Sequence, residues 1–91
     1  MIISVGHENF VESDSVVAIL RPDSAPARSL KHRATQSGML INATSGRKTR
    51  SLIVLNSNHV VLSALLPKTL MQKFQHLTQN KNLKSLSFMT E

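Results

Sequence analysis

The sequence predicts a small α+β fold in which a mostly antiparallel sheet is accompanied by two helices. Its 91 residues suit one domain. Short β-branched runs separated by polar turns are typical of strands, and two segments combine helix-start signals with apolar residues at helical spacing. We expect the folded domain to cover residues 1–78, followed at residues 79–91 by a C-terminal extension or tail rich in Asn, Lys and Ser.

The predicted strands are short apolar runs bounded by polar residues, glycine or proline. The last two flank Asn56–His59, a tight turn in which Asn accepts the positive φ that hairpins require. Neither strand of this hairpin alternates apolar with polar residues, so both of its faces should be covered. Two helices or a second subunit could cover them, and we expect self-association because so small a core is thin. The strands are expected at Ile2–Val5, Phe10–Glu12, Val16–Leu20, Met39–Ile41, Ser51–Leu55 and Val60–Leu65.

The first helix is predicted from Ser24 to about Ser37. The Ser24 side chain can accept hydrogen bonds from the free amides of the first turn, where Pro26 is tolerated. Gly38 then supplies the left-handed conformation that commonly ends a helix. Its apolar face comprises Ala27, Leu30 and Ala34, while Arg28, Lys31 and His32 share another face.

The second helix is predicted to open at Pro67. Apolar residues then recur with helical spacing, which gives the helix a face that can pack on the sheet. That face comprises Leu70, Met71, Phe74 and Leu77.

The charge of the chain is large and unevenly distributed. Formal net charge is +6, and from Ser24 to Thr90 there are ten Lys and Arg residues but no carboxylate. Internal ion pairs cannot neutralise such a stretch, so an external polyanion is expected to do so. Nucleic acid is the commonest such partner. An anionic membrane surface is the weaker candidate, because the chain lacks the Trp and Tyr that usually accompany basic membrane-surface helices.

The strongest functional candidate is the segment Gly46–Arg50. Its glycine permits a sharp turn, and Arg47, Lys48 and Arg50 should project from a loop held by strands at both ends. The hydroxyls of Thr44, Ser45, Thr49 and Ser51 suit phosphate oxygens. We predict phosphate contact by the three cations, flanked by a second basic patch at Arg28 and Lys31, although an ordinary solvated basic loop has the same composition.

Other chemistries find little support in the sequence. The histidines His7, His32, His59 and His76 lack metal-site spacing, and His59 is expected to bond the hairpin turn. No nucleophile motif surrounds Ser63. We therefore expect no enzyme activity, cofactor, metal or small-molecule ligand. Three phenylalanines are the only aromatics, which favours duplex over single-stranded nucleic acid.

Three segments together resemble the RemA family, the extracellular matrix regulatory protein A group of bacteria. They are Pro22–Pro26, Gly38–Arg50 and Ser57–Ala64, and the resemblance runs from about Ile3 to Phe74. It implies a small α+β domain that assembles into a closed ring and regulates biofilm matrix genes by wrapping duplex DNA over repeated basic loops. The family's Gly-Arg-Arg-Thr-Arg stretch corresponds to Gly46–Arg50. The resemblance therefore implies DNA contact by Arg47 and Lys48, and also by Arg50.

The chain departs from the family pattern at several positions. Ser15 stands where an Arg helps DNA binding in the family, and Gly6–Asn9 replaces a Gly-Phe-Gly-Asn sequence. Asparagines replace family aspartates at Asn42, Asn56 and Asn58.

We therefore predict a homo-oligomeric regulator that binds double-stranded DNA. The absence of cysteine, of a signal peptide and of a membrane span favours the cytoplasm. The alternatives are a basic RNA-associated or structural module without a regulatory role, and a non-catalytic subunit of a larger complex.

Overall fold

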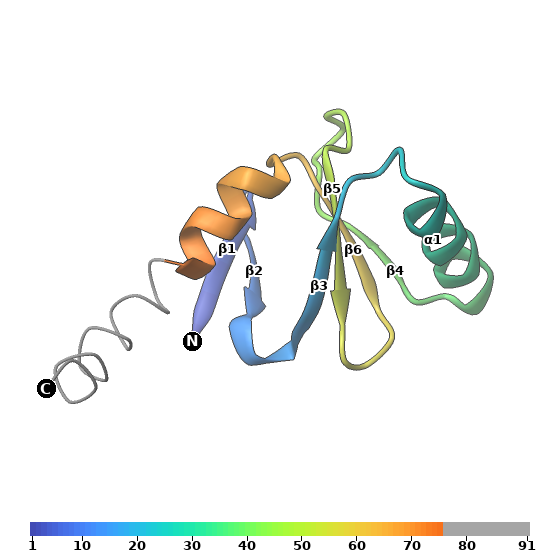
Figure 1. Cartoon of the computed structure of the whole chain (residues 1–91), viewed down its shortest axis with the longest axis horizontal. Coiled ribbons are helices and arrows are strands. Elements are labelled where there is room, and N and C mark those ends of the chain that lie inside the picture. Colours follow the sequence, from blue (N-terminus) through green and yellow to red (C-terminus); the bar gives the residue numbers. More distant parts are fainter. Residues whose placement is uncertain (76–91) are drawn as a thin grey trace, which may run out of the picture.

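The computed structural model describes residues 1–75 and forms six strands, one short 3-10 helix and two α-helices there (Figure 1). The elements are β1 (Ile2–Gly6), β2 (Asn9–Glu12), η1 (Ser13–Ser15), β3 (Val16–Leu20), α1 (Ala25–Ser37), β4 (Leu40–Asn42), β5 (Ser51–Leu55) and β6 (Val60–Ser63). A last helix covers residues 67–75. Leu77 and the predicted tail at residues 79–91 lie outside the described residues. No helix within residues 1–75 is long and apolar enough to cross a bilayer.

The strands form two sheets, and one of them is mixed rather than purely antiparallel. β1 and β2 make an antiparallel hairpin, and the larger sheet has the order β3-β5-β6-β4. β5 runs antiparallel to β3 and β6, whereas β4 pairs parallel to β6. The parallel pair arises because α1 carries the chain back between β3 and β4. As a result β3, β6 and β4 all terminate at the same end of the sheet, which is the end where β5 begins.

Local signals set the limits of α1 as predicted. The Ser24 Oγ accepts a hydrogen bond from the Ala27 N–H at 3.2 Å, and Pro26 lies in the first turn. Gly38 adopts a left-handed conformation with φ +73°, and the Met39 N–H then donates to the Ala34 carbonyl at 2.8 Å. These bonds satisfy backbone groups that the helix itself leaves free at its ends.

The core consists of two layers, one on each face of the larger sheet. Residues that alternate along β5 point to opposite faces, so Leu52 packs beneath α1 and Ile53 packs toward β1 and β2. The α1 layer is completed by Ala27, Ala34, Val60 and Leu62. The opposite layer is completed by Ile3, Val5, Val11, Ala43, Val61 and Leu70. Both faces of the β5–β6 hairpin are therefore covered, as its apolar sequence predicts, within a single chain (Figure 1).

Two expectations about packing were wrong in detail. β6 ends at Ser63 instead of continuing to Leu65, because the buried Ser63 Oγ donates to the Val5 carbonyl at 2.7 Å and accepts from the Leu65 N–H at 3.0 Å. In the last helix Leu70 is fully buried, but Met71 is 44 % exposed. Phe74 packs against the layer that contains Leu70.

Candidate nucleic-acid interface

Three chain segments meet where β3, β6 and β4 end and β5 begins. They are residues 21–23, 43–50 and 64–68, and we call this end of the larger sheet the basic end. The connection between β4 and β5 projects beyond the sheet there, beside the β5 label in Figure 1. Loops at the carboxyl ends of strands are common places for ligand binding, because rigid strands hold them from below.

The predicted turn at Gly46 is present and tightly defined. The Arg47 N–H donates to the Thr44 carbonyl at 3.0 Å, and the two central residues, Ser45 and Gly46, have φ of +52° and +79°. Two consecutive left-handed residues are characteristic of a type I′ turn. The turn directs the chain outward immediately before the first cation of the loop.

The loop is anchored to the sheet on both sides of the turn. On one side, the buried Thr44 hydroxyl donates to Asn42 Oδ1 at 2.7 Å. On the other, the Arg50 N–H donates to the Ser63 carbonyl at 2.8 Å, and the buried Ser51 hydroxyl donates to the Leu65 carbonyl. The expectation that Thr44 and Ser51 contact phosphate is therefore wrong, because both hydroxyls are buried and hold the loop in place.

The three loop cations are free to meet an external anion. Arg47, Lys48 and Arg50 are all exposed. Among residues 1–75 the ion pairs are the Met1 ammonium with Glu12 and Arg21 with Asp23, so none involves this loop. Exposed guanidinium and ammonium groups on an anchored backbone can donate charge-assisted hydrogen bonds to phosphate oxygens.

A first hollow lies between this loop and the turn that joins β1 to β2. It measures about 500 Å³ and includes His7. The Asn9 side-chain amide ties that turn to the Ala43 carbonyl at 3.3 Å, which fixes His7 on the same side as the cations. The hollow is lined by His7, Arg47, Lys48, Arg50, Ala64 and Leu65.

A second hollow of about 500 Å³ opens on the other side of the loop. It adds two cations that the sequence analysis missed, Arg21 at the end of β3 and Lys68 in the first turn of the last helix. No local sequence pattern predicts that Arg21 or Lys68 lies near the loop, because only the order of the strands brings their chain segments beside Lys48 and Arg50. The lining residues are Arg21, Pro22, Asp23, Lys48, Thr49, Arg50, Leu66, Pro67 and Lys68.

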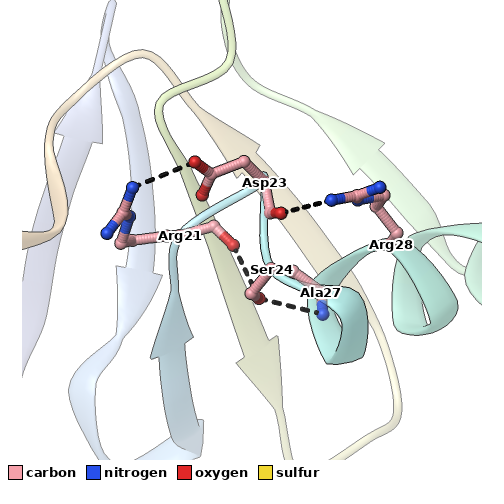
Figure 2. A network of polar contacts seen from close by, with 5 residues as sticks. All are labelled: Arg21, Asp23, Ser24, Ala27 and Arg28. Atoms are coloured by element: carbon pink, nitrogen blue, oxygen red, sulfur yellow. Dashed lines mark hydrogen bonds and ion pairs between the residues drawn. The ribbon is translucent and has the colours of Figure 1, made fainter.

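The predicted flanking patch on α1 is only partly joined to the basic end. Figure 2 shows Arg21 and Arg28 on either side of Asp23. Arg21 pairs with the Asp23 carboxylate at 2.9 Å, and the Arg28 guanidinium donates to the Asp23 backbone carbonyl at 2.6 Å. Lys31 lies exposed one turn further along α1 and lines neither hollow.

The predicted contact of His59 with the hairpin turn is confirmed. The His59 Nδ1 lies 2.7 Å from the Ser57 Oγ within the β5–β6 turn. Within residues 1–75 no three His, Cys, Asp or Glu side chains gather closely enough to hold a metal ion.

Comparison with known proteins identifies the family. A family model described as RemA-like, extracellular matrix regulatory protein A-like, matches residues 2–74. A Fervidobacterium nodosum protein is 48% identical over 73 residues, which cover 80% of this chain and 78% of the relative. A Pseudothermotoga lettingae protein is 46% identical over 74 residues, or 81% of each chain. A Thermotoga maritima protein is 48% identical over 73 residues, covering 80% of this chain and 79% of the relative. All three carry names that propose a regulatory role. The match extends over both core layers and the whole basic end, and on that ground the chain belongs to the RemA-like family.

Proposed function

We propose that the protein is a transcription regulator that binds double-stranded DNA through Arg47, Lys48 and Arg50, repeated on a homo-oligomer. The names of its relatives support a regulatory role, and the family description supports control of extracellular matrix, or biofilm, genes. The observation that carries the proposal is the projection of three exposed cations from one anchored loop, with no carboxylate paired to them among residues 1–75.

Duplex DNA suits the basic end better than single-stranded nucleic acid. Proteins that hold single strands stack bases on aromatic side chains beside the basic groove. Here Phe74 packs on the core, and Phe10 lines a hollow that contains no cation. Backbone phosphates are therefore the part of a nucleic acid that this surface can bind.

Repetition of the loop explains how so few cations could give useful affinity. Log K falls by about 0.9 per neutralised phosphate for each log unit of salt, so one loop with three contacts binds weakly at physiological salt. An oligomer turns the later contacts into intramolecular ones. DNA would have to bend to follow such an array, at a cost of a few kcal/mol per site.

An exposed apolar face supports self-association. Phe10 is 60 % exposed and Ile41 is 45 % exposed, and both line a hollow of about 330 Å³ beside β4. β4 is also an edge strand of the larger sheet, and an unpaired edge is open to a second chain. We assign this face to contact between copies of the chain, a proposal that light scattering on the purified protein tests directly.

The DNA proposal is tested by fluorescence anisotropy with a labelled duplex over a range of salt concentrations. Arg47→Ala should weaken binding and lower the salt slope by about 0.9 for each loop that contacts the DNA, and Arg47→Ala with Lys48→Ala should lower it by about twice that amount. Arg33→Ala is the matched control, since Arg33 is exposed on α1 and lines a hollow with Asn58 and Val60, away from the basic end.

Two outcomes would contradict this function. Undiminished binding by the double variant would exclude the loop as the contact. Tighter binding of a structured RNA in direct competition would favour the RNA-associated alternative instead.

A further inference from the structure

We propose that the second hollow, bounded by Arg21, Arg50 and Lys68, binds a free nucleotide, and that this ligand and duplex DNA exclude one another. Binding of the nucleotide stands on the hollow alone, and its exclusion by DNA rests on the proposed function. The hollow measures about 500 Å³, which lies within the range of small-molecule sites in proteins, roughly 300–1,000 Å³.

Charge in the hollow converges from three separate chain segments. Arg21 follows β3, Lys48 and Arg50 belong to the loop before β5, and Lys68 lies in the first turn of the last helix. Asp23 is the one carboxylate among the lining residues, and it already pairs with Arg21 at 2.9 Å. The Asp23 pair orients the Arg21 guanidinium and leaves its other N–H groups available. The remaining excess of positive charge suits a ligand with two or three negative charges, such as a diphosphate.

The apolar part of the lining distinguishes a nucleotide from a bare anion. Pro22, Leu66 and Pro67 lie beside the cations, and Leu66 is 50 % exposed. Proline fixes its own backbone φ, so two prolines give this wall a defined shape before any ligand arrives. A nucleotide could place its phosphates on the cations and its base against this wall.

Duplex DNA cannot use the same wall. Its bases are stacked inside the helix and most of its protein contacts are to phosphate and sugar. A free nucleotide exposes its base and therefore matches both parts of the lining. This difference favours the free ligand over a phosphate of the DNA backbone as the occupant.

The hollow shares two cations with the proposed DNA contact. Lys48 and Arg50 line it and also form two of the three proposed phosphate contacts of the loop. A nucleotide bound there would neutralise both and occupy their donors. Duplex DNA and nucleotide would then compete, which gives the regulator a means of responding to a small anionic metabolite.

Isothermal titration calorimetry with ADP and, separately, inorganic pyrophosphate tests the site. We expect ADP to bind with a sub-millimolar Kd and more tightly than pyrophosphate, because only ADP can use the apolar wall. Arg21→Ser and Lys68→Gln should each weaken ADP binding roughly tenfold, the size of one charge-assisted contact. Arg47→Ala should leave ADP binding unchanged, because Arg47 does not line this hollow. All of these side chains are exposed, so circular dichroism should show every variant folded.

Several results would overturn the assignment. They are no ADP binding up to 1 mM, equal affinity for ADP and pyrophosphate, or ADP binding that ignores Arg21→Ser and Lys68→Gln. A loss of duplex binding by those variants without any ADP binding would instead assign the hollow to DNA. If ADP binds as described and no duplex DNA binds at all, the nucleotide site stands and the proposed function fails.

Discussion

The two ends of the larger sheet share an architecture and differ in charge. The opposite end comprises η1, residues 38–39 and the turn at residues 56–59. Both ends are closed by backbone hydrogen bonds between neighbouring segments, such as Arg50 N–H to Ser63 O at one end and Asn56 N–H to Ser15 O at the other, each 2.8 Å. Both contain a left-handed residue in a tight turn, Gly46 with φ +79° and Asn58 with φ +72°.

The charged side chains distinguish the two ends most clearly. The basic end carries Arg21, Arg47, Lys48, Arg50 and Lys68, whereas the segments of the opposite end contain no Lys or Arg. Turn geometry and anchoring therefore do not mark the end that we propose binds DNA, because both ends have them. The difference supports the general view that a fold provides rigid positions and that function resides in the groups placed on them.

The largest expected effect is on duplex affinity. It should follow a charge reversal in the basic end, whereas the same reversal near the opposite end should change affinity little. Arg47→Glu places an anion where we propose a phosphate, so duplex affinity at low salt should fall by about 100-fold. Arg33→Glu makes the same charge change beside Asn58, near the opposite end, and its effect should be only a few-fold because Arg33 makes no proposed phosphate contact. Fluorescence anisotropy on both variants measures the ratio. Equal losses would mean that net charge, and not the loop, governs binding.

The next prediction concerns the free energy of unfolding, which should fall more for a substitution at the basic end than for one at the opposite end. Ser63 is fully buried and its hydroxyl bridges the Val5 carbonyl and the Leu65 N–H. Ser63→Val leaves both groups unsatisfied and should lower the free energy of unfolding by about 1–3 kcal/mol. Ser57→Ala removes an exposed hydroxyl bond in the opposite turn and should cost under about 0.5 kcal/mol. Urea denaturation distinguishes the two, and a similar cost for both would show that the Ser63 bridge is not needed.

The sequence predicted what is encoded locally. The limits of α1 follow from Ser24 and Gly38, which act on neighbouring backbone groups, and β3 and β5 follow from their own apolar runs. The cations of the Gly46–Arg50 loop were also visible, because they are adjacent in the chain.

What the sequence did not predict depends on distant segments. β6 stops at Ser63 because its hydroxyl reaches Val5, 58 residues away along the chain. The parallel β4–β6 pair sets which loops share an edge, so Arg21 and Lys68 become neighbours of the loop only in three dimensions. The hydroxyls of Thr44 and Ser51 were misassigned for the same reason, since burial is not visible in a polar stretch.

The two left-handed turns offer a further comparison. At Gly46 a Cβ would meet nothing within 4 Å, so Gly46→Ala should cost only the left-handed strain, about 1–2 kcal/mol. Asn58→Gly relieves a milder strain and should change stability by a few tenths of a kcal/mol. We also expect Gly46→Ala to weaken duplex binding several-fold because it disturbs the loop, while Asn58→Gly leaves binding intact. Binding loss at Asn58 would contradict the assignment of DNA contact to the basic end.

The smallest expected effect is on the stability of the fold at acidic pH, and it arises from Glu12 at the opposite end. The Glu12 carboxylate caps η1, where a hydrogen bond from the Met1 ammonium, and then one from the Asp14 N–H, lowers its pKa below the usual value of 4.5. A lowered pKa stabilises the fold at pH values above 4.5, and this contribution is lost as pH falls through the folded pKa. It should be small because the group is exposed to solvent.

Thermal melting of the wild type and Glu12→Gln isolates this contribution. The wild type should melt slightly higher at pH 7, and the two curves should converge well below pH 4.5, because the protonated carboxyl no longer differs from the amide in charge. A difference in melting temperature that persists at pH 2 would mean that Glu12 acts through packing and not through its ion pair.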